Sequence, residues 1–272
     1  MPPASLRVSS TGRQPGLTAQ GTIGPPGIPG HEVSGVVAEL GYGTTGLTVG
    51  QRVFGITDWA RNGSLAEYVA VEARNLAPLS AHIDHTVAAA LPISGLTAWQ
   101  GRFNHPHLVT GQTVLVHGAA GAVGSIAVQL AREAGARVIG SGRTEHRDTV
   151  LGLDADRFLD LQRDRLEDVG KVDVVFDVIG GETLKRSAQL VRSGGALITI
   201  AEPPRVRPEH GRTIFFVVEP DRAGLAALER RLHDGRLRPI VGAVCSLAEA
   251  PSAFDPACRS RGKTIIAITD AD

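Results

Sequence analysis

Cysteine, aromatic residues and long apolar runs are all scarce in this sequence of 272 residues. Its two cysteines, Cys245 and Cys258, are too few for a small secreted fold held by disulfides, so a reducing compartment is expected. No stretch approaches the roughly 18 apolar residues that span a bilayer, and residues 1–20 lack the apolar segment of a signal peptide. These absences predict a cytoplasmic globular protein.

The sequence also lacks an excess of either charge. It has 28 basic and 28 acidic side chains, which are scattered rather than clustered, so nothing favours a nucleic-acid partner or a membrane surface. Glycine is abundant instead, with 33 residues. Many glycines are typical of a chain with tight turns and close backbone approaches, as in a βαβ protein with a phosphate-binding loop.

The pattern of residue types changes twice along the sequence. Residues 1 to about 27 are rich in Pro, Gly, Ser and Thr and are expected to form a loop or a loosely ordered arm. Short strand-like runs then follow at 33–40, 51–56 and 66–71, which predicts an all-β domain. From His82 onward, helical and strand-like segments alternate. We therefore expect three parts: 1–82 as the first part of a β domain, 83–235 as an α/β domain, and 236–272 as a return to the β domain.

The alternating part predicts a doubly wound parallel sheet. Its strands are expected near 112–117, 136–140, 157–161, 171–178, 195–201 and 213–218, with helices at 86–91, 95–103, 123–134, 182–191 and 222–232. The helix at 123–134 has a 3.6-residue apolar stripe of the kind that packs on a sheet. Strands that alternate with helices pair in parallel and are covered on both faces.

A glycine-rich loop joins the first strand of this part to its helix. The string is Ala119-Ala120-Gly121-Ala122-Val123-Gly124, in which alanine replaces the first glycine of the dinucleotide fingerprint and Gly118 comes one residue earlier. Gly121 would let the backbone approach a pyrophosphate, and Gly124 would let the helix pack closely on the strand. The helix N-terminus then offers N–H groups and a positive dipole end to phosphates. The context of strand, loop, helix and second strand predicts NAD(P) binding.

The end of the second strand should distinguish the two dinucleotides. An acid there would hydrogen-bond the ribose 2′-hydroxyl of NAD, but this chain has Ser141, followed by Arg143. A serine hydroxyl and an arginine side chain are suited to a 2′-phosphate. The sequence therefore favours NADP, with Arg147 as a further candidate. The alternative is that Arg143 is a solvated surface residue.

Five strings, in order, carry a resemblance to a known family. They are Ile28-Pro29-Gly30-His31-Glu32-Val33-Ser34-Gly35, Gly50-Gln51-Arg52-Val53-Phe54-Gly55, Gly63-Ser64-Leu65-Ala66-Glu67-Tyr68-Val69, Ala90-Leu91-Pro92-Ile93-Ser94-Gly95-Leu96-Thr97-Ala98-Trp99 and the loop from Gly118 to Gly124. The chain resembles the zinc-independent quinone oxidoreductase branch of the medium-chain dehydrogenase/reductase superfamily.

This resemblance implies a GroES-like catalytic domain that is split around a Rossmann domain, with the cofactor between the two. It implies hydride transfer from NADPH to a quinone or an α,β-unsaturated carbonyl compound. It also implies a homodimer formed by pairing of strand 213–218 with its copy. The implied cofactor contacts, besides the loop, are Thr97, Val178, Ile179, Ile200, Ala201, Phe215, Phe216, Val217 and Lys263.

Relatives carry a longer segment before the first string, so the catalytic domain is expected to be incomplete at its N-terminus. This leaves an alternative function, an NADP(H)-binding sensor or subunit with little turnover. A non-redox enzyme that reuses the same cleft is a third possibility, because fold alone does not fix chemistry.

A zinc site is not expected. Catalytic zinc needs three Cys, His or carboxylate ligands, and His31-Glu32 has no cysteines nearby to complete such a set. We expect His31 and Glu32 to form local hydrogen bonds at the start of a strand. No catalytic residue is nominated, because the cofactor carries the difficult step of a hydride transfer to a conjugated carbonyl.

Overall fold

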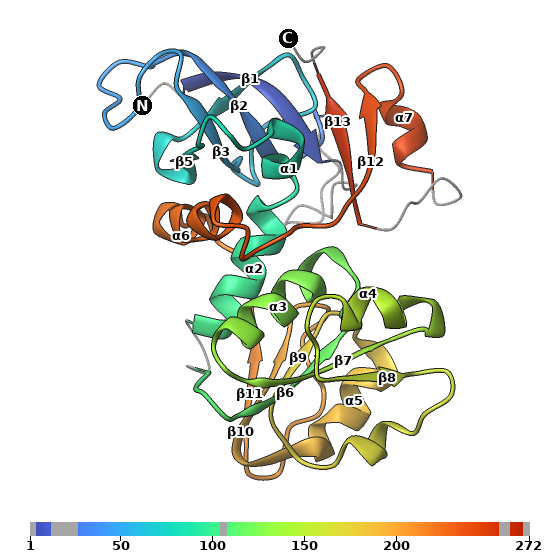
Figure 1. Cartoon of the computed structure of the whole chain (residues 1–272). Coiled ribbons are helices and arrows are strands. Elements are labelled where there is room, and N and C mark those ends of the chain that lie inside the picture. Colours follow the sequence, from blue (N-terminus) through green and yellow to red (C-terminus); the bar gives the residue numbers. More distant parts are fainter. Residues whose placement is uncertain (1–3, 12–26, 104–107, 256–261, 269–272) are drawn as a thin grey trace. The chain divides into compact units, whose positions relative to one another are not determined.

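The computed structural model describes residues 4–11, 27–103, 108–255 and 262–268, and it divides the chain into two compact units. One unit comprises residues 1–96 and 220–272, and the other comprises residues 97–219. The C-terminal segment is therefore grouped with the first part of the chain. Figure 1 labels the helices and strands of both units.

The unit of residues 97–219 is built on a parallel six-stranded sheet in the order β11-β10-β9-β6-β7-β8. In terms of position along the chain, this is the Rossmann order 3-2-1-4-5-6 read from the opposite edge. The strands are β6 (Thr113–His117), β7 (Arg137–Gly142), β8 (Arg157–Asp160), β9 (Val172–Asp177), β10 (Val191–Thr199) and β11 (Arg212–Phe215). The predicted α/β fold class is confirmed.

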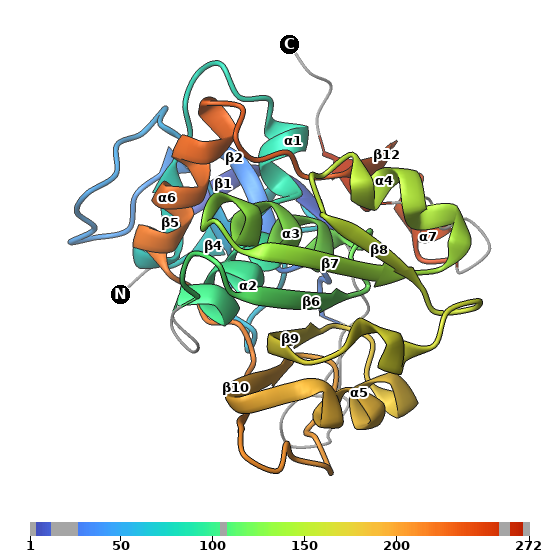
Figure 2. The ribbon, with the colours of Figure 1, turned by 60° about the horizontal axis from the view of Figure 1, so that its bottom comes forward.

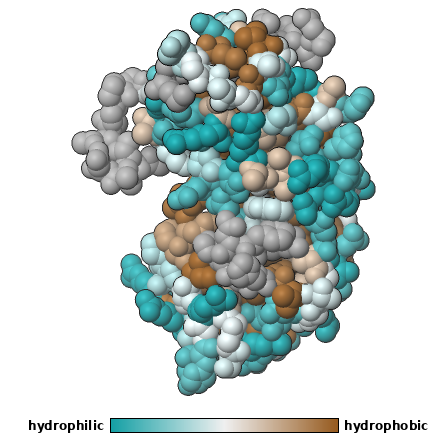
Figure 3. Space-filling model, turned by 90° about the vertical axis from the view of Figure 1, so that its left-hand side faces the viewer, coloured by the Kyte–Doolittle hydropathy of each residue, from teal (hydrophilic) through white to brown (hydrophobic). Residues whose placement is uncertain are grey.

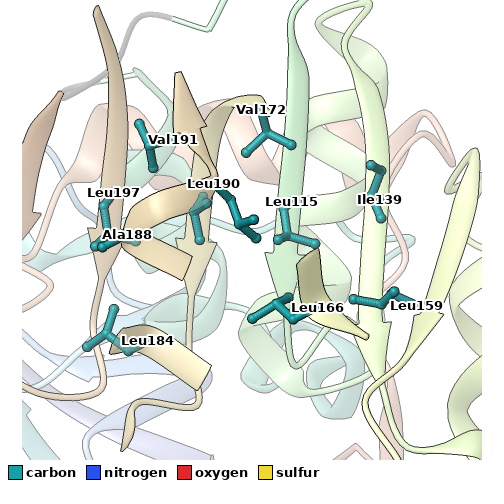
Figure 4. Packing of buried hydrophobic residues seen from close by; sticks show 11 residues of the cluster. Leu115, Ile139, Leu159, Leu166, Val172, Leu184, Ala188, Leu190, Val191 and Leu197 are labelled. Atoms are coloured by element: carbon teal, nitrogen blue, oxygen red, sulfur yellow. The ribbon is translucent and has the colours of Figure 1, made fainter. Parts of the chain in front are cut away.

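Helices connect these strands and cover both faces of the sheet. They are α3 (Ala122–Glu133), α4 (Arg147–Leu151) and α5 (Gly181–Ser187), and α3 and α5 lie on opposite faces (Figure 2). Eleven buried apolar residues from the strands, from α5 and from the adjoining turns form one cluster, shown as sticks in Figure 4. The parallel strand order brings the loops after β6, β7, β9 and β10 to the same edge of the sheet.

The other unit contains a seven-stranded sheet in the order β12-β13-β1-β2-β3-β5, with β4 paired to β1. Its strands are β1 (Ala4–Thr11), β2 (Glu32–Glu39), β3 (Arg52–Ile56), β4 (Tyr68–Val71), β5 (Leu76–Pro78), β12 (Val241–Ser246) and β13 (Lys263–Ala267). Valines and leucines from β2 to β5 form its core, including Val33, Val53 and Leu76. The helices are α1 (His85–Ala89), α6 (Arg222–His233) and the short α7 (Ala250–Ala253).

The interpretation of the first 27 residues as loop was wrong for Ala4–Thr11. This segment forms β1, which pairs antiparallel with β2, β4 and β13. Only Leu6 to Val8 carried a strand signal in the sequence, and the long-range pairing with three other strands extends it. Residues 12–26 lie outside the described part of the chain.

The compact units divide the chain at other places than the expected boundaries after His82 and Gly235. Helix α1 packs on β2, and α6 packs on β5, so both helices belong with the strand-rich unit although their sequences look like part of the α/β alternation. The first boundary falls inside helix α2 (Pro92–Phe103). This helix begins at Pro92, which the sequence had placed between two helices. Proline suits the first helical position because it has no N–H to leave unpaired.

No helix among the described residues is both long and apolar enough to cross a membrane. On the face drawn in Figure 3, apolar residues form separate groups among hydrophilic ones.

Candidate functional site

The glycine loop after β6 adopts a conformation that only glycine fits at two positions. Gly118 has a φ of +67°, in the left-handed region. At Gly124, a Cβ atom would lie 2.1 Å from the carbonyl oxygen of Gly118, so any side chain would push the helix away from the loop. The alanine in the fingerprint, Ala119, is fully buried and donates its N–H to the Ser141 carbonyl at 3.0 Å. The left-handed turn therefore sits one residue before the position where the fingerprint has its first glycine.

The N-terminus of α3 is arranged to receive an anion. Gly121 is the N-cap residue, and no side chain caps the helix. The first-turn N–H groups at Ala122 and Val123 therefore point away from the helix at its positive dipole end. A helix of twelve residues that starts at an uncapped glycine fits the pyrophosphate of a dinucleotide.

The loops after β9 and β10 are tied together by Asp177. This buried carboxylate accepts hydrogen bonds from the Gly180 N–H at 3.0 Å and from the Thr199 hydroxyl at 2.9 Å. Burial raises the pKa of the Asp177 carboxyl, the hydrogen bonds from Thr199 and the loop oppose this, and the charge of Glu202 adds to the rise. Glu202 itself accepts the Gly181 N–H at 2.7 Å. The two loops are thus held in one position by two carboxylates.

This arrangement brings several of the predicted cofactor contacts together. A Cβ atom built on Gly118 would lie 2.6 Å from the Val178 side chain and 3.4 Å from that of Ile179, so these loops touch. A Cβ atom on Gly180 would lie 3.1 Å from Ala201. The segment Val178–Ile179 therefore adjoins the glycine loop, and Ala201 adjoins the loop after β9, at the carboxyl edge of the sheet where open α/β sheets bind ligands.

The remaining predicted contacts lie farther along this edge or elsewhere. Phe215 ends β11 and is the register partner of Thr199, so Phe215 to Val217 continue from the same edge. Phe215 and Val217 are exposed, and Phe216 is half-buried. Thr97 is buried in α2. The last predicted contact, Lys263, belongs to the other compact unit.

Ser141, predicted as a phosphate ligand, directs its hydroxyl into the domain instead. The side chain is fully buried, and its Oγ lies 2.6 Å from Nδ1 of His117. The other ring nitrogen of His117 lies 2.7 Å from the Ser187 hydroxyl, which donates to the Thr183 carbonyl. Ser187 must therefore accept from His117 Nε2–H, which leaves Nδ1 to accept from Ser141. This buried relay, comprising Ser141, His117, Ser187 and the Thr183 carbonyl, links β7, β6 and α5.

Burial lowers the pKa of His117 to about 4, because the imidazolium would lose its hydration in the interior. The ring is therefore neutral at pH 7, as the relay requires. Neither His117 nor Ser187 was predicted from the sequence to have a role. The available signal was a polar residue at the end of the apolar run Val114-Leu115-Val116, opposite a second polar residue at the end of the next strand.

Arg143 follows β7 directly and is solvent-exposed, with its Nε 3.1 Å from a carboxylate oxygen of Glu145. Between them, Thr144 donates its hydroxyl to Asp160 at 2.5 Å, which fixes the turn. Arg147, the further candidate, has its guanidinium 5.8 Å from the centre of the Phe158 ring. Of the three residues predicted to contact a 2′-phosphate, Arg143 is exposed, whereas the Ser141 hydroxyl is buried and engaged by His117.

In the strand-rich unit, His31 and Glu32 lie at the start of β2 as expected, but their hydrogen bonds are long-range in the sequence and not local. His31 Nδ1 lies 2.9 Å from the Thr57 hydroxyl, and its ring packs against Trp59. Burial lowers the pKa of His31, although Asp58 and Glu32 act in the other direction. Glu32 is buried and accepts both the Ile93 N–H at 2.8 Å and the Lys263 ammonium.

No group of three or more potential metal ligands was found among the residues that the structure describes. Cys245 lies on β12, and Cys258 falls outside the described residues.

Two family models match the chain. The model described as the alcohol dehydrogenase GroES-like domain matches residues 6–81, and that described as zinc-binding dehydrogenase matches residues 122–217. The first match falls within the strand-rich unit and the second within the six-stranded unit.

Three curated proteins are similar along most of this chain. Spectinabilin polyketide synthase system protein NorB from Streptomyces orinoci is 33% identical over 89% of this chain, which is 12% of its own length. The 2-methylene-furan-3-one reductase of Solanum lycopersicum is 32% identical over 85% of this chain and 58% of its own length. The chloroplastic NADPH-dependent alkenal/one oxidoreductase of Arabidopsis thaliana is 32% identical over 79% of this chain and 56% of its own length. The chain thus spans less than two thirds of each relative.

Solved structures share the fold across nearly the whole chain. An alcohol dehydrogenase superfamily protein from Novosphingobium aromaticivorans superposes with a TM-score of 0.88 at 26% identity, covering 98% of this chain and 92% of that one. The quinone oxidoreductase from Coxiella burnetii gives a TM-score of 0.87 at 23% identity, with 98% and 90% coverage, and supports the fold alone.

Proposed function

The chain belongs to the medium-chain dehydrogenase/reductase superfamily of oxidoreductases, and from this premise we propose that it transfers a hydride from NADPH to a quinone or an α,β-unsaturated carbonyl compound, without zinc. The observation that carries the proposal is the uncapped N-terminus of α3 at the glycine loop, beside the loops after β9 and β10.

The residues of the six-stranded unit supply the cofactor site in this proposal. N–H groups at Ala122 and Val123 bind the pyrophosphate, and Gly124 keeps the helix close enough to present them. Asp177 fixes the loop that carries Val178 and Ile179. When bound, the nicotinamide supplies the hydride, and the protein orients it and keeps water away.

The choice of NADPH rests on the residues after β7 and on one relative. Arg143 is an exposed cation directly after the strand end where the ribose of a dinucleotide is recognised. A guanidinium can bind a 2′-phosphate through two parallel hydrogen bonds. The Arabidopsis relative is named as NADPH-dependent.

The choice of acceptor rests on the relatives. One is named as a 2-methylene-furan-3-one reductase and one as an alkenal/one oxidoreductase, and a protein named quinone oxidoreductase is also similar to this chain. An enone and a quinone both accept a hydride at a carbon conjugated to a carbonyl group. No side chain of this chain is assigned as the proton donor.

Zinc independence is proposed from the chemistry of the side chains at His31. The carboxylate of Glu32 is engaged by Lys263 and Ile93, and the nearest side-chain partners of His31 are a hydroxyl and an indole ring. These groups do not form the Cys, His and carboxylate set that catalytic zinc uses. We expect full activity after treatment with a chelator, and loss of activity that returns with Zn²⁺ would contradict this part of the proposal.

We also propose a homodimer formed by pairing of β11 with its copy. The strand lies at an edge of the sheet, and the buried Oγ1 of Thr213 on it has no hydrogen-bond partner among the described residues. An unpaired edge strand is a template for pairing with another chain. Sedimentation of the protein as a monomer at micromolar concentration would argue against this assembly.

The test of the proposed function is a titration with NADPH followed by turnover assays. Tryptophan fluorescence reports binding, and oxidation of NADPH is then followed with a benzoquinone and with a 2-alkenal. We expect saturable binding and turnover of at least one of the two acceptor classes. Binding without oxidation of NADPH by any quinone or enone would refute the reductase assignment and favour a sensor or subunit.

A matched pair of glycine variants tests whether the loop is the binding site. Gly124→Ala places a methyl group 2.1 Å from the Gly118 carbonyl oxygen and should abolish NADPH binding. Gly152→Ala adds the same methyl group at the end of α4, at an αR backbone of φ −68°, and should leave binding unchanged. Equal binding by both variants would place the cofactor elsewhere.

A further inference from the structure

We propose that Glu145 lowers the affinity of this protein for NADPH and so limits its preference for NADPH over NADH: it holds Arg143 in an ion pair and repels a 2′-phosphate. This inference rests on the proposed function, because it concerns the same dinucleotide site. Its experiment compares two cofactors in matched variants, so it fails separately from the proposed function.

In many dinucleotide-binding domains, an acidic residue at the end of the second strand hydrogen-bonds the ribose 2′-hydroxyl of NAD. Ser141 occupies this position, and its hydroxyl is fully buried against His117. Neither a carboxylate nor a hydroxyl is therefore presented to a ribose from the end of β7. Discrimination must come from the turn that follows, residues 143–147.

That turn carries two side chains of opposite charge, Arg143 and Glu145. Arg143 Nε lies 3.1 Å from Glu145 Oε1, and the two side chains are 65% and 43% exposed, so a ligand in solution can reach both. The turn is held in place at two points. Thr144 donates its hydroxyl to Asp160, and the His146 N–H donates to the Arg143 carbonyl at 2.9 Å. A fixed turn thus presents a cation and an anion side by side.

When NADPH binds, its 2′-phosphate and the Glu145 carboxylate compete for the guanidinium of Arg143. A 2′-phosphate must displace the Glu145 carboxylate from Arg143, and it must then remain close to that negative charge. NADH has only a hydroxyl at the same position, which neither competes for Arg143 nor is repelled by a carboxylate. Glu145 therefore weakens the binding of NADPH selectively.

The variant Glu145→Gln removes the charge and keeps the size of the side chain. An exposed ion pair contributes ~0.2–1 kcal/mol, so Glu145→Gln should bind NADPH about 1.4-fold to 5-fold more tightly than the wild type. Its dissociation constant for NADH should not fall. Because both charges are exposed, the gain should shrink between low ionic strength and 0.5 M salt, where screening is stronger.

The control is Asp148→Asn, which removes an equal charge from an exposed residue in the first turn of α4. It should leave the ratio of the NADPH and NADH dissociation constants unchanged, which separates the local effect from a change in net charge. In the Arg143→Gln background, Glu145→Gln should have a smaller effect, because the competition for the guanidinium is gone and only the repulsion of the 2′-phosphate by the carboxylate remains.

Unchanged or weaker NADPH binding by Glu145→Gln would overturn the proposal, and so would an equal gain in NADPH affinity from Asp148→Asn. Failure of the proposed function has a different signature: either neither cofactor binds the wild type or any of the variants, or NADPH binds but is not oxidised by any quinone or enone.

Discussion

The buried relay through His117 predicts that acid destabilises the six-stranded unit in a way that depends on this one side chain. The pKa of His117 is about 4 in the folded protein and 6.5 for an unperturbed histidine. The unfolded chain therefore takes up a proton on this residue between pH 6.5 and pH 4, whereas the folded chain does not. The stabilising contribution is complete above pH 6.5 and is lost as the pH falls toward 4.

The magnitude follows from the size of the shift. A difference of about 2.5 pKa units corresponds to about 3 kcal/mol, since each unit is worth about 1.4 kcal/mol. About 2 kcal/mol of this should be lost between pH 8 and pH 5, because at pH 5 the unfolded imidazole is almost fully protonated while the folded one remains neutral. This loss is a large part of the stability of an ordinary domain.

The assay compares urea unfolding of the wild type and of His117→Gln at pH 8 and pH 5. Glutamine retains a donor and an acceptor for Ser187 and Ser141 but does not titrate. Both proteins carry Trp59→Phe, so that Trp99, in residues 97–219, reports on the six-stranded unit alone. The wild type should lose about 2 kcal/mol more than His117→Gln between the two pH values.

The matched control is His210→Gln, which replaces a histidine whose side chain is 68% exposed in the same unit. This variant should show the same loss between pH 8 and pH 5 as the wild type. If wild type and His117→Gln lose equal free energy of unfolding, the imidazole is not held neutral and the assignment of the relay is wrong.

Three further predictions concern other buried or strained residues. Lys263→Met should lower the free energy of unfolding by ~3–5 kcal/mol, because it leaves the Glu32 carboxylate buried without its cation. The double variant Lys263→Met/Glu32→Gln should recover part of this loss in thermal denaturation, and no recovery would contradict the pairing. Asp177→Ala should weaken NADPH binding and lower stability by ~1–3 kcal/mol, since the Gly180 N–H and the Thr199 hydroxyl lose their acceptor; wild-type affinity would show that these loops are held by other contacts. Asp154→Gly should not reduce stability, unlike the usual replacement by glycine, because Asp154 has a φ of +65°; a lower melting temperature would argue against this backbone conformation.

The α/β part of the fold could be predicted because its signals are local. The apolar runs before and after the glycine loop, and the helical period between them, each depend on residues within a few turns. The boundaries of the units could not be read in the same way. Helices α1 and α6 have the same local patterns as the Rossmann helices, but the strands on which they pack are far away in the sequence. Strand β1 escaped detection for a related reason, because its three pairing partners come from three separate parts of the chain.

In the candidate site, the sequence predicted where residues lie but not how their side chains are oriented. The sequence predicted where β7 ends and showed that Ser141 stands there in place of an acidic residue. This was enough to favour NADP over NAD. It did not show that the Ser141 hydroxyl turns inward, because that depends on His117 in the neighbouring strand and on Ser187 in α5. Because this hydroxyl is engaged in the buried relay, a 2′-phosphate at the end of β7 would meet the side chains of the following turn. Under the proposal made above, cofactor preference would then depend on the balance between Arg143 and Glu145, whose opposite charges a motif scan would record simply as a neutral surface pair.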